Sequence, residues 1–165
     1  MTCKTKKLAQ LGILLGVIVV ITTIEFMFII PFMPPHTKPG FANIVVMFCV
    51  FKIGKREAVA LNILKSLFVL ATRGFLAGLL SFSGGLLSII VVILLASYKK
   101  FGFAFIGAMS AIAHNLGQLL VVMLILTNTA LMYYAPILVV SGVITGLVTG
   151  TLLKTLINTL GAVRK

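Results

Sequence analysis

Apolar residues dominate the chain in long runs, and short stretches rich in glycine, proline or charge separate these runs. About twenty apolar residues span a bilayer as one helix. The pattern therefore predicts six membrane-crossing helices, at about residues 8–30, 41–53, 57–72, 82–98, 101–126 and 131–153. The second run is short at 13 residues, so it needs help from the preceding loop or a thin region of membrane. Residues 74–80 are expected to form a short helix or a re-entrant segment.

Composition agrees with this pattern. Hydrophobic residues make up 61% of the 165 residues, charged residues make up 10%, and the mean hydropathy is +1.24. Soluble domains have about 45–50% apolar and about 25% charged residues. We therefore predict an all-α integral membrane protein with a single transmembrane domain over residues 1–165. The N-terminal MTCKTKK and the apolar run after it resemble a signal peptide, but that run is too long and no A-x-A site follows, so we interpret it as a retained helix.

The net charge of +12 has a topological explanation. In a soluble protein such a charge would suggest nucleic-acid binding. Here the basic residues lie between apolar runs, as they do in the cytoplasmic loops of membrane proteins. We therefore expect membrane lipid and no nucleic acid as a partner. With the N-terminus inside, the outer side receives only Lys38 and Arg73. The cytoplasmic side receives eleven residues, which are Lys4, Lys6, Lys7, Lys52, Lys55, Arg56, Lys99, Lys100, Lys154, Arg164 and Lys165. This bias predicts a multi-pass cell-membrane protein with both termini in the cytoplasm.

Catalytic and metal-binding patterns are lacking. The two acidic residues, Glu25 and Glu57, are far apart in sequence, and the chain has no Asp and no phosphate-binding loop. Paired acid–base chemistry is therefore unsupported. Cys3 and Cys49 are not expected to form a disulfide, and no metal-ligand spacing occurs. We expect no enzymatic activity from the chain alone, no cofactor and no metal.

Polar residues inside the predicted helices are the main candidates for function. His114, Asn115 and Gln118 stand in AHNLGQ, between long apolar segments and among small residues. Polar groups at such depth are expensive unless they face the bundle interior or a hydrated cavity. Two interpretations remain open: a ligand site, or hydrogen bonds that hold helices together.

Two charged residues also lie inside predicted helices. Lys65 either extends its long side chain toward the cytoplasm or faces the interior, as a ligand group or in a pair. Asn62 and Arg73 are expected along the same broad face. Glu25 either pairs with Arg73, Lys38 or His36 at the outer mouth or is exposed to lipid headgroups. Both alternatives stay open for each residue.

Small residues recur at four-residue spacing on two helices, which lets another helix approach closely. The first helix carries Gly12 and Gly16, extended by Ala9, and the last carries Gly142, Gly146 and Gly150. Either set would serve internal packing or a partner subunit.

Four segments resemble a known family: KPGFANIVVMF (38–48), SFSGGLLSIIVV (81–92), AHNLGQLLVV (113–122) and YYAPILVVSGVITG (133–146). Together they are similar to the Gx transporter family, whose members are often labelled heptaprenyl diphosphate synthase component I. That family resembles the substrate-binding S components of energy-coupling factor transporters, which implies a six-helix bundle with both termini inside. The resemblance extends over nearly the whole chain.

The resemblance also implies roles for residues. The solute site would use the matching motif residues, which are Pro39, Gly40, Ala42, Asn43, Gly84, Gly85, Ser88, His114, Asn115, Gly117 and Gln118. The pocket would open outward under a lid formed by PFMPPHTKPG, with Pro34, Pro35, His36, Pro39 and Gly40, although a plain turn is the alternative. The small face with Ala9, Gly12 and Gly16 would dock a coupling subunit.

Three functions remain in competition. The leading one is a binding or transport subunit for a small, partly apolar solute such as a vitamin, quinone precursor or isoprenoid. Asn43, His114, Asn115 and Gln118 would hold its polar end, and Lys65 or Arg73 would complement negative charge. Its partner would be a coupling transmembrane protein with ATPase subunits. The second is an accessory component that recruits a soluble prenyl diphosphate synthase. The third is a structural subunit of a quinone-related membrane complex.

Overall fold

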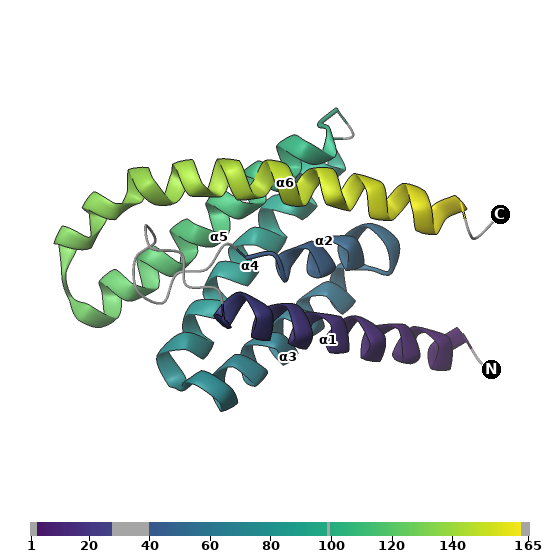
Figure 1. Cartoon of the computed structure of the whole chain (residues 1–165), viewed down its shortest axis with the longest axis horizontal. Helices are drawn as coiled ribbons and strands as arrows, with labels where there is room; N and C mark the ends of the chain where they lie inside the picture. Colours follow the sequence, from purple (N-terminus) through teal and green to yellow (C-terminus); the bar gives the residue numbers. More distant parts are fainter. Residues whose placement is uncertain (1–2, 28–39, 99, 163–165) are drawn as a thin grey trace.

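The computed structural model describes residues 3–27, 40–98 and 100–162, and these ranges contain helices and no strand (Figure 1). A six-residue 3-10 helix, η1 (Thr129–Tyr134), precedes the last α-helix. The α-helices are α1 (Cys3–Met27), α2 (Asn43–Lys52), α3 (Lys55–Arg73), α4 (Phe75–Ser97), α5 (Phe103–Leu126) and α6 (Ala135–Ala162). The predicted all-α class is therefore confirmed.

Four helical segments are long and apolar enough to cross a membrane. They are Thr5–Glu25 in α1, all of α4, all of α5, and Thr129–Thr159 across η1 and α6. This indicates a membrane protein. Helix α2 is apolar but only 10 residues long, and α3 begins with three charged residues, Lys55, Arg56 and Glu57. That α2 and α3 also cross the membrane stays a prediction.

Several predicted helix boundaries are wrong. Residues 74–80 are not a separate or re-entrant piece, because α4 begins at Phe75 and continues to Ser97. Its glycines are tolerated because they allow close contacts; a Cβ at Gly78 would lie 2.5 Å from Leu70 Cβ. Helix α6 extends past Leu153 to Ala162, and it begins only after η1. The predicted end of the first helix, residues 28–30, lies outside the described residues.

The glycines of α6 pack inside the protein. A Cβ at Gly146 would lie 2.4 Å from Ala108 Cα, and one at Gly150 would lie 2.3 Å from the Phe103 carbonyl oxygen. Gly107 on α5 meets the same two glycines from the other side. The backbones of α5 and α6 therefore touch, and the small residues of α6 serve internal packing.

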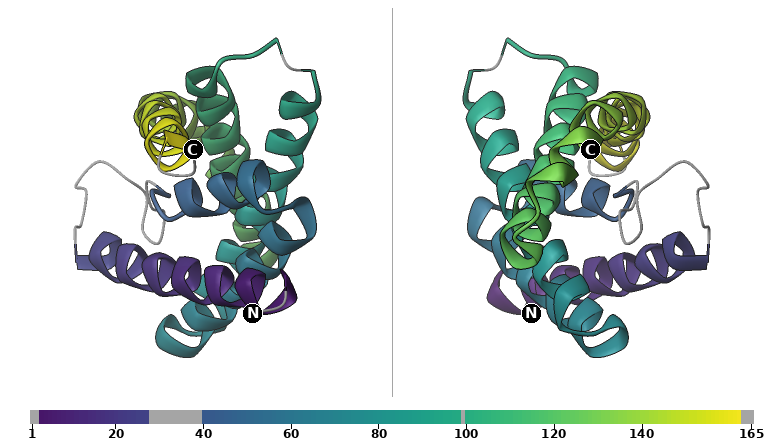
Figure 2. Two further views of the ribbon diagram at one scale, coloured as in Figure 1. Left: turned by 90° about the vertical axis from the view of Figure 1, so that its right-hand side faces the viewer. Right: turned by 90° about the vertical axis from the view of Figure 1, so that its left-hand side faces the viewer.

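Helix α2 lies in the middle of the molecule, between α1 and α6 (Figures 1 and 2). Its apolar residues form two core clusters, one with Ile18 and Leu61 and the other with Val92 and Leu153. Helix α1 lies at the periphery, where most of its surface is exposed. The first residue of α2, Asn43, is held in the interior and is 7% exposed.

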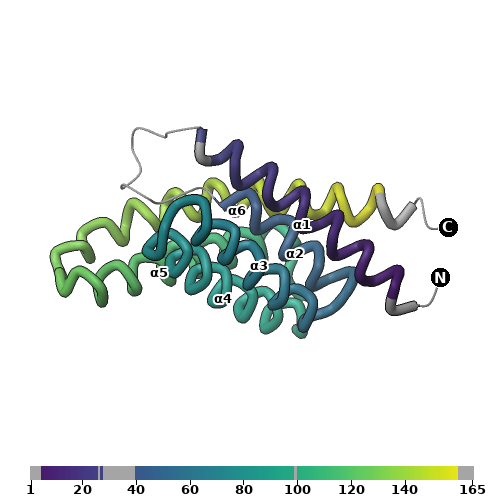
Figure 3. Tube along the Cα trace, turned by 90° about the horizontal axis from the view of Figure 1, so that it is seen from below, coloured from purple at the N-terminus to yellow at the C-terminus, as the bar shows by residue number. Residues whose placement is uncertain are grey.

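The connections between helices gather at two ends of the molecule. The start of α1, the end of α6 and the α2–α3 connection lie at one end, and the α3–α4 and α5–α6 connections lie at the other (Figures 1 and 3). The α2–α3 connection at the first end is flanked by Lys52, the last residue of α2, and by Lys55 and Arg56, the first residues of α3. The observed arrangement thus places these basic residues beside the N-terminal lysines.

Candidate functional site

Buried polar side chains from four helices, α1, α2, α3 and α5, converge where α2 begins. We call this set the interior polar cluster, and every member is at most 8% exposed. Its members are Glu25, Asn43, Asn62, Lys65, His114 and Gln118. Buried polar groups are costly unless they find partners, so the hydrogen bonds of each member decide what the cluster does.

Lys65 is paired inside the protein. Its Nζ donates a hydrogen bond to Asn43 Oδ1 at 2.6 Å, and the side chain is 5% exposed. It therefore does not extend out of the bundle, as one interpretation of the sequence expected. Glu25 and His114 both lie close enough to Lys65 to interact with it electrostatically. The ammonium group thus forms the electrostatic centre of the cluster.

Glu25 lies at the N-terminus of α2. Its Oε1 accepts a hydrogen bond from the backbone N–H of Phe41, and the backbone of Ala42 also interacts with this carboxylate. Phe41 and Ala42 directly precede α2, which begins at Asn43, and the N-terminus of a helix favours a negative charge. Of the two alternatives for Glu25, exposure to lipid headgroups is therefore wrong, because the side chain is 8% exposed. Two of its predicted partners, His36 and Lys38, lie outside the described residues.

Arg73 lies near Glu25 but at the edge of the cluster. It is half-buried at the end of α3, and its Nη2 donates to the Thr22 carbonyl oxygen at 2.6 Å. Its charge also interacts with Glu25. Arg73 therefore links α3 to α1 and contributes positive charge at this end.

His114 and Gln118 contact each other on one face of α5. The Gln118 amide Nε2 lies 3.1 Å from His114 Nε2. If the Gln118 amide donates to His114 Nε2, a neutral His114 ring carries its proton on Nδ1. No described group meets His114 Nδ1 or Gln118 Oε1 in hydrogen-bonding geometry, although the Gly84 backbone interacts with the ring. The pair therefore presents one donor and one acceptor that the described residues do not use.

Three glycines make room for these side chains. A Cβ at Gly84 would lie 2.7 Å from the His114 carbonyl oxygen, and one at Gly85 would lie 1.8 Å from Asn62 Oδ1. Gly40 has a positive φ of 77°, and a Cβ there would lie 3.6 Å from His114 Cδ2. The SGG segment of α4 therefore lets the polar residues of α3 and α5 approach one another.

Asn115 has a different role from its neighbours. Its Nδ2 donates to the Leu138 carbonyl oxygen at 2.8 Å and to Ser141 Oγ at 3.4 Å, so it links α5 to α6. Ser88 and Ser110 similarly link α4 to α5, with 2.7 Å between their hydroxyl oxygens. The structure thus separates Asn115 from His114 and Gln118.

Sequence reasoning missed one contributor to the cluster, the backbone N–H of Phe41, which carries no signal in a side-chain pattern. Asn62 stands three residues before Lys65, so the sequence places both on one broad face of the helix, although Asn62 was not assigned to the solute site. Its Nδ2 donates to the Phe82 carbonyl oxygen at 3.3 Å, and its Oδ1 has no partner among the described residues.

Two further segments were predicted to be functional, the lid and the small face on the first helix. Pro34, Pro35, His36 and Pro39 of the predicted lid lie outside the described residues, and only Gly40 is described. The small face on α1 is exposed, and a Cβ at Gly12 or Gly16 would meet nothing within 4 Å among the described residues.

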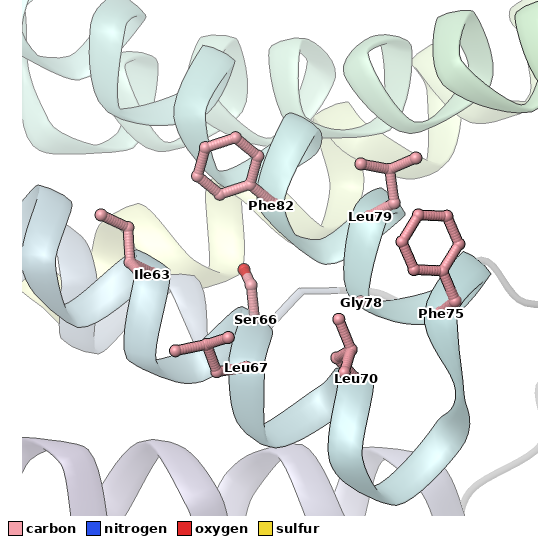
Figure 4. Close-up of a pocket in the computed structure, with 8 residues that line it drawn as sticks. All are labelled: Ile63, Ser66, Leu67, Leu70, Phe75, Gly78, Leu79 and Phe82. Carbon is pink, nitrogen blue, oxygen red and sulfur yellow. The ribbon is translucent and has the colours of Figure 1, made fainter.

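An apolar groove lies elsewhere, between α3 and α4 (Figure 4). It encloses about 170 Å³, and none of the predicted site residues lines it. Its lining residues are Ile63, Ser66, Leu67, Leu70, Phe75, Gly78, Leu79 and Phe82. Ser66 Oγ already donates to the Asn62 carbonyl oxygen at 2.8 Å, so the groove suits lipid chains better than a polar group.

Comparison with known proteins gives one match. The family described as heptaprenyl diphosphate synthase component I matches residues 14–156. The chain belongs to this family. The component I match includes every member of the interior polar cluster, and the family name implies a partner component of heptaprenyl diphosphate synthase. No curated protein and no solved structure matches this component I chain. Its described residues also contain no group of three His, Cys, Asp or Glu placed to hold a metal.

Proposed function

We propose that the chain is a membrane-embedded substrate-binding subunit, similar to S components, for a small and partly apolar solute. The observation that carries the proposal is the interior polar cluster, in which His114 Nδ1 and Gln118 Oε1 have no partner among the described residues. Leaving a buried polar group without a partner costs about 1–3 kcal/mol. A solute with both an acceptor and a donor would recover that cost.

The surroundings of the cluster support a solute with an apolar part. Ligand sites are mostly apolar with a few placed polar groups, and they often lie between the helices of a bundle. Here Leu119 and Leu80 are buried on the helices that carry Gln118 and Gly84. The chain would bind the solute and leave energy coupling to a transmembrane partner with ATPase subunits.

Family membership favours a second candidate. As component I of heptaprenyl diphosphate synthase, the chain would recruit a soluble prenyl diphosphate synthase to the membrane. The chain itself would supply no catalysis, because it has only two acidic residues for binding metal–diphosphate. Co-purification of a soluble prenyltransferase with the tagged chain would support this candidate, and saturable solute binding by the chain alone would support the first.

The proposed topology places both termini in the cytoplasm. The start of α1 and the end of α6 lie at one end of the molecule, beside the α2–α3 connection (Figure 1). Cytoplasmic loops carry an excess of Lys and Arg. In this orientation the C-terminal end of α1 and the connection that follows it would face outward.

The test begins with mass spectrometry of the purified chain, which identifies any solute retained through purification. Binding of that solute is then measured with His114→Ala/Gln118→Ala, and Asn115→Ala is the control. Each lost neutral hydrogen bond costs about 0.5–1.5 kcal/mol, and about 1.4 kcal/mol is tenfold in affinity. We expect the double variant to lose about tenfold in affinity with little change in melting temperature.

The control should behave in the opposite way. Asn115 bonds to α6, so Asn115→Ala should lower the melting temperature and leave the affinity unchanged. If instead the double variant melts much lower and binds the solute normally, His114 and Gln118 only hold helices together. The proposed binding site would then be refuted.

A further inference from the structure

Every tyrosine of the chain lies at an end of a long helix. The chain has three tyrosines and no tryptophan. Tyr98 directly follows α4, whereas Tyr133 and Tyr134 lie in η1, directly before α6, and all three side chains are exposed. Helix α5 connects these two places (Figure 1). The tyrosines therefore mark its two opposite ends.

Exposed phenylalanines accompany the tyrosines at both ends. The ring centroids of Tyr98 and Phe101 lie 6.5 Å apart in an edge-on arrangement, and Phe101 stacks on Phe105 at 4.9 Å. Phe75, the first residue of α4, is exposed at the other end. We call these exposed side chains the α4–α5 aromatic set, which is Tyr98, Phe101 and Phe105, and the η1 aromatic set, which is Phe75, Tyr133 and Tyr134.

The surface between the two sets has a different character. The large exposed hydrophobic side chains of α4 and α5 are aliphatic or Met there, apart from Phe82 in the apolar groove. Helix α4 has 23 residues and α5 has 24, so each is about 35 Å long at about 1.5 Å per residue. The hydrocarbon core of a bilayer is about 30 Å thick. The two aromatic sets are thus about one bilayer core apart along these helices.

The chemistry of the two sets suits the headgroup layers. A tyrosine has an apolar ring and a hydroxyl that needs a hydrogen-bond partner, and tyrosine is enriched at both membrane–water interfaces. Lys100 is exposed beside Phe101, and its charge suits the phosphate of an anionic lipid. The α4–α5 connection projects on the side of the molecule away from α1 (Figures 1 and 2), where lipid can reach it.

We infer that the two aromatic sets bind the headgroup layers of the bilayer, one set on each side. This assigns a lipid-binding surface to each end and fixes the depth of α4 and α5. His114 stands near the middle of α5, so the interior polar cluster lies near the centre of the bilayer. The inference does not rest on solute binding, and its failure would leave the proposed function standing.

The test uses the native chain in vesicles of phosphatidylcholine and phosphatidylglycerol. Without tryptophan, the fluorescence of the chain comes from its three tyrosines. Part of the phosphatidylcholine carries bromine, either near the headgroup or near the methyl end of the acyl chains. We expect the shallow bromine to quench the tyrosine fluorescence more strongly than the deep bromine. Stronger quenching by the deep bromine would overturn the inference, and so would quenching by aqueous iodide alone, which would place the tyrosines in water.

Conservative substitutions separate the two ends. Tyr133→Phe/Tyr134→Phe leaves only the fluorescence of Tyr98, and Tyr98→Phe leaves only that of η1. Both variants keep the aromatic rings, so the helices should hold their depth. Each variant should be quenched more strongly by the shallow bromine. If only one of them is, the placement of both sets at headgroup layers is wrong.

Ile90→Trp is the matched control for depth. Ile90 is exposed on α4, eight residues before Tyr98, which is about 12 Å along the helix. The centre of the hydrocarbon core lies about 15 Å from its edge, so this tryptophan should lie close to the centre. Its fluorescence is excited separately from that of tyrosine, and the deep bromine should quench it more strongly. Stronger quenching by the shallow bromine would mean that α4 does not cross the bilayer, which would also overturn the inference.

Discussion

The α5–α6 interface allows a quantitative test of the fold, by changing Gly107 to Ala. A Cβ at Gly107 would lie 2.3 Å from the Gly146 carbonyl oxygen and 2.7 Å from Gly150 Cα. Ordinary Cβ contacts begin at 3.4 Å, so the two backbones must separate by about 1 Å. Both neighbours are backbone atoms, so no flexible side chain can absorb the change.

The magnitude follows from a comparison with Gly16→Ala on α1. Both variants gain the better helix propensity of alanine, about 1 kcal/mol, so this gain cancels in the comparison. Overpacking typically costs about 1–3 kcal/mol, and only Gly107→Ala suffers it, because Gly16 has open space. We therefore expect Gly107→Ala to be less stable than Gly16→Ala by about 1–3 kcal/mol.

The assay is thermal unfolding of both purified variants in the same detergent. For chains of about 150–250 residues, 1 kcal/mol shifts the melting temperature by about 2–4 °C. Gly107→Ala should therefore melt about 2–12 °C below Gly16→Ala. Equal melting temperatures would refute the close α5–α6 contact, and a lower value for Gly16→Ala would mean that α1 is packed against another helix.

Four further predictions concern topology, the cluster, α1 and catalysis. In a chain without Cys3 and Cys49, single cysteines at positions 36 and 129 should react with an impermeant thiol reagent added from outside. A single cysteine at position 99 should not react, and its labelling from outside would contradict six membrane crossings. Gly85→Ala should lower the melting temperature, because its Cβ would lie 1.8 Å from Asn62 Oδ1, whereas Gly102→Ala, with open space, should not. Lys7→Gln should destabilise slightly at low salt and not at high salt, as expected for an exposed ion pair; an equal loss at both would point to packing. The purified chain should hydrolyse neither ATP nor diphosphates, and metal-dependent prenyl transfer by it would refute this.

The class of fold could be predicted from the sequence because the bilayer sets the length of apolar helices. Most helix boundaries followed from the same rule. The start of α4 did not, because Gly and Ser in residues 81–85 look like a connector when taken alone. Within α4, Gly84 and Gly85 leave the space that His114 and Asn62 fill, and these two residues are distant in sequence.

The candidate site was only partly predictable. Burial of His114 and Gln118 follows from the cost of polar groups in lipid. Asn115 has a different role from His114 and Gln118, because it links α5 to α6. This role depends on the position of α6, since the Leu138 carbonyl oxygen accepts the Asn115 amide proton. The position of Glu25 depends on the backbone of Phe41, and no residue pattern reveals a backbone N–H that lacks a partner.

The contacts of α1 also have a consequence for biosynthesis. Lys7 pairs with Glu57, and the Thr22 carbonyl accepts from Arg73, so these contacts join residues 50 and 51 positions apart. At about 5–20 residues per second, the ribosome needs roughly 3–10 seconds to make the intervening chain. During that interval α1 has neither partner, and Glu25 has no charge beside it from α3. The newly made helix must therefore wait at the insertion machinery or in the lipid until α3 emerges, and the packing of α3 against α1 is the step that fixes α1 in place.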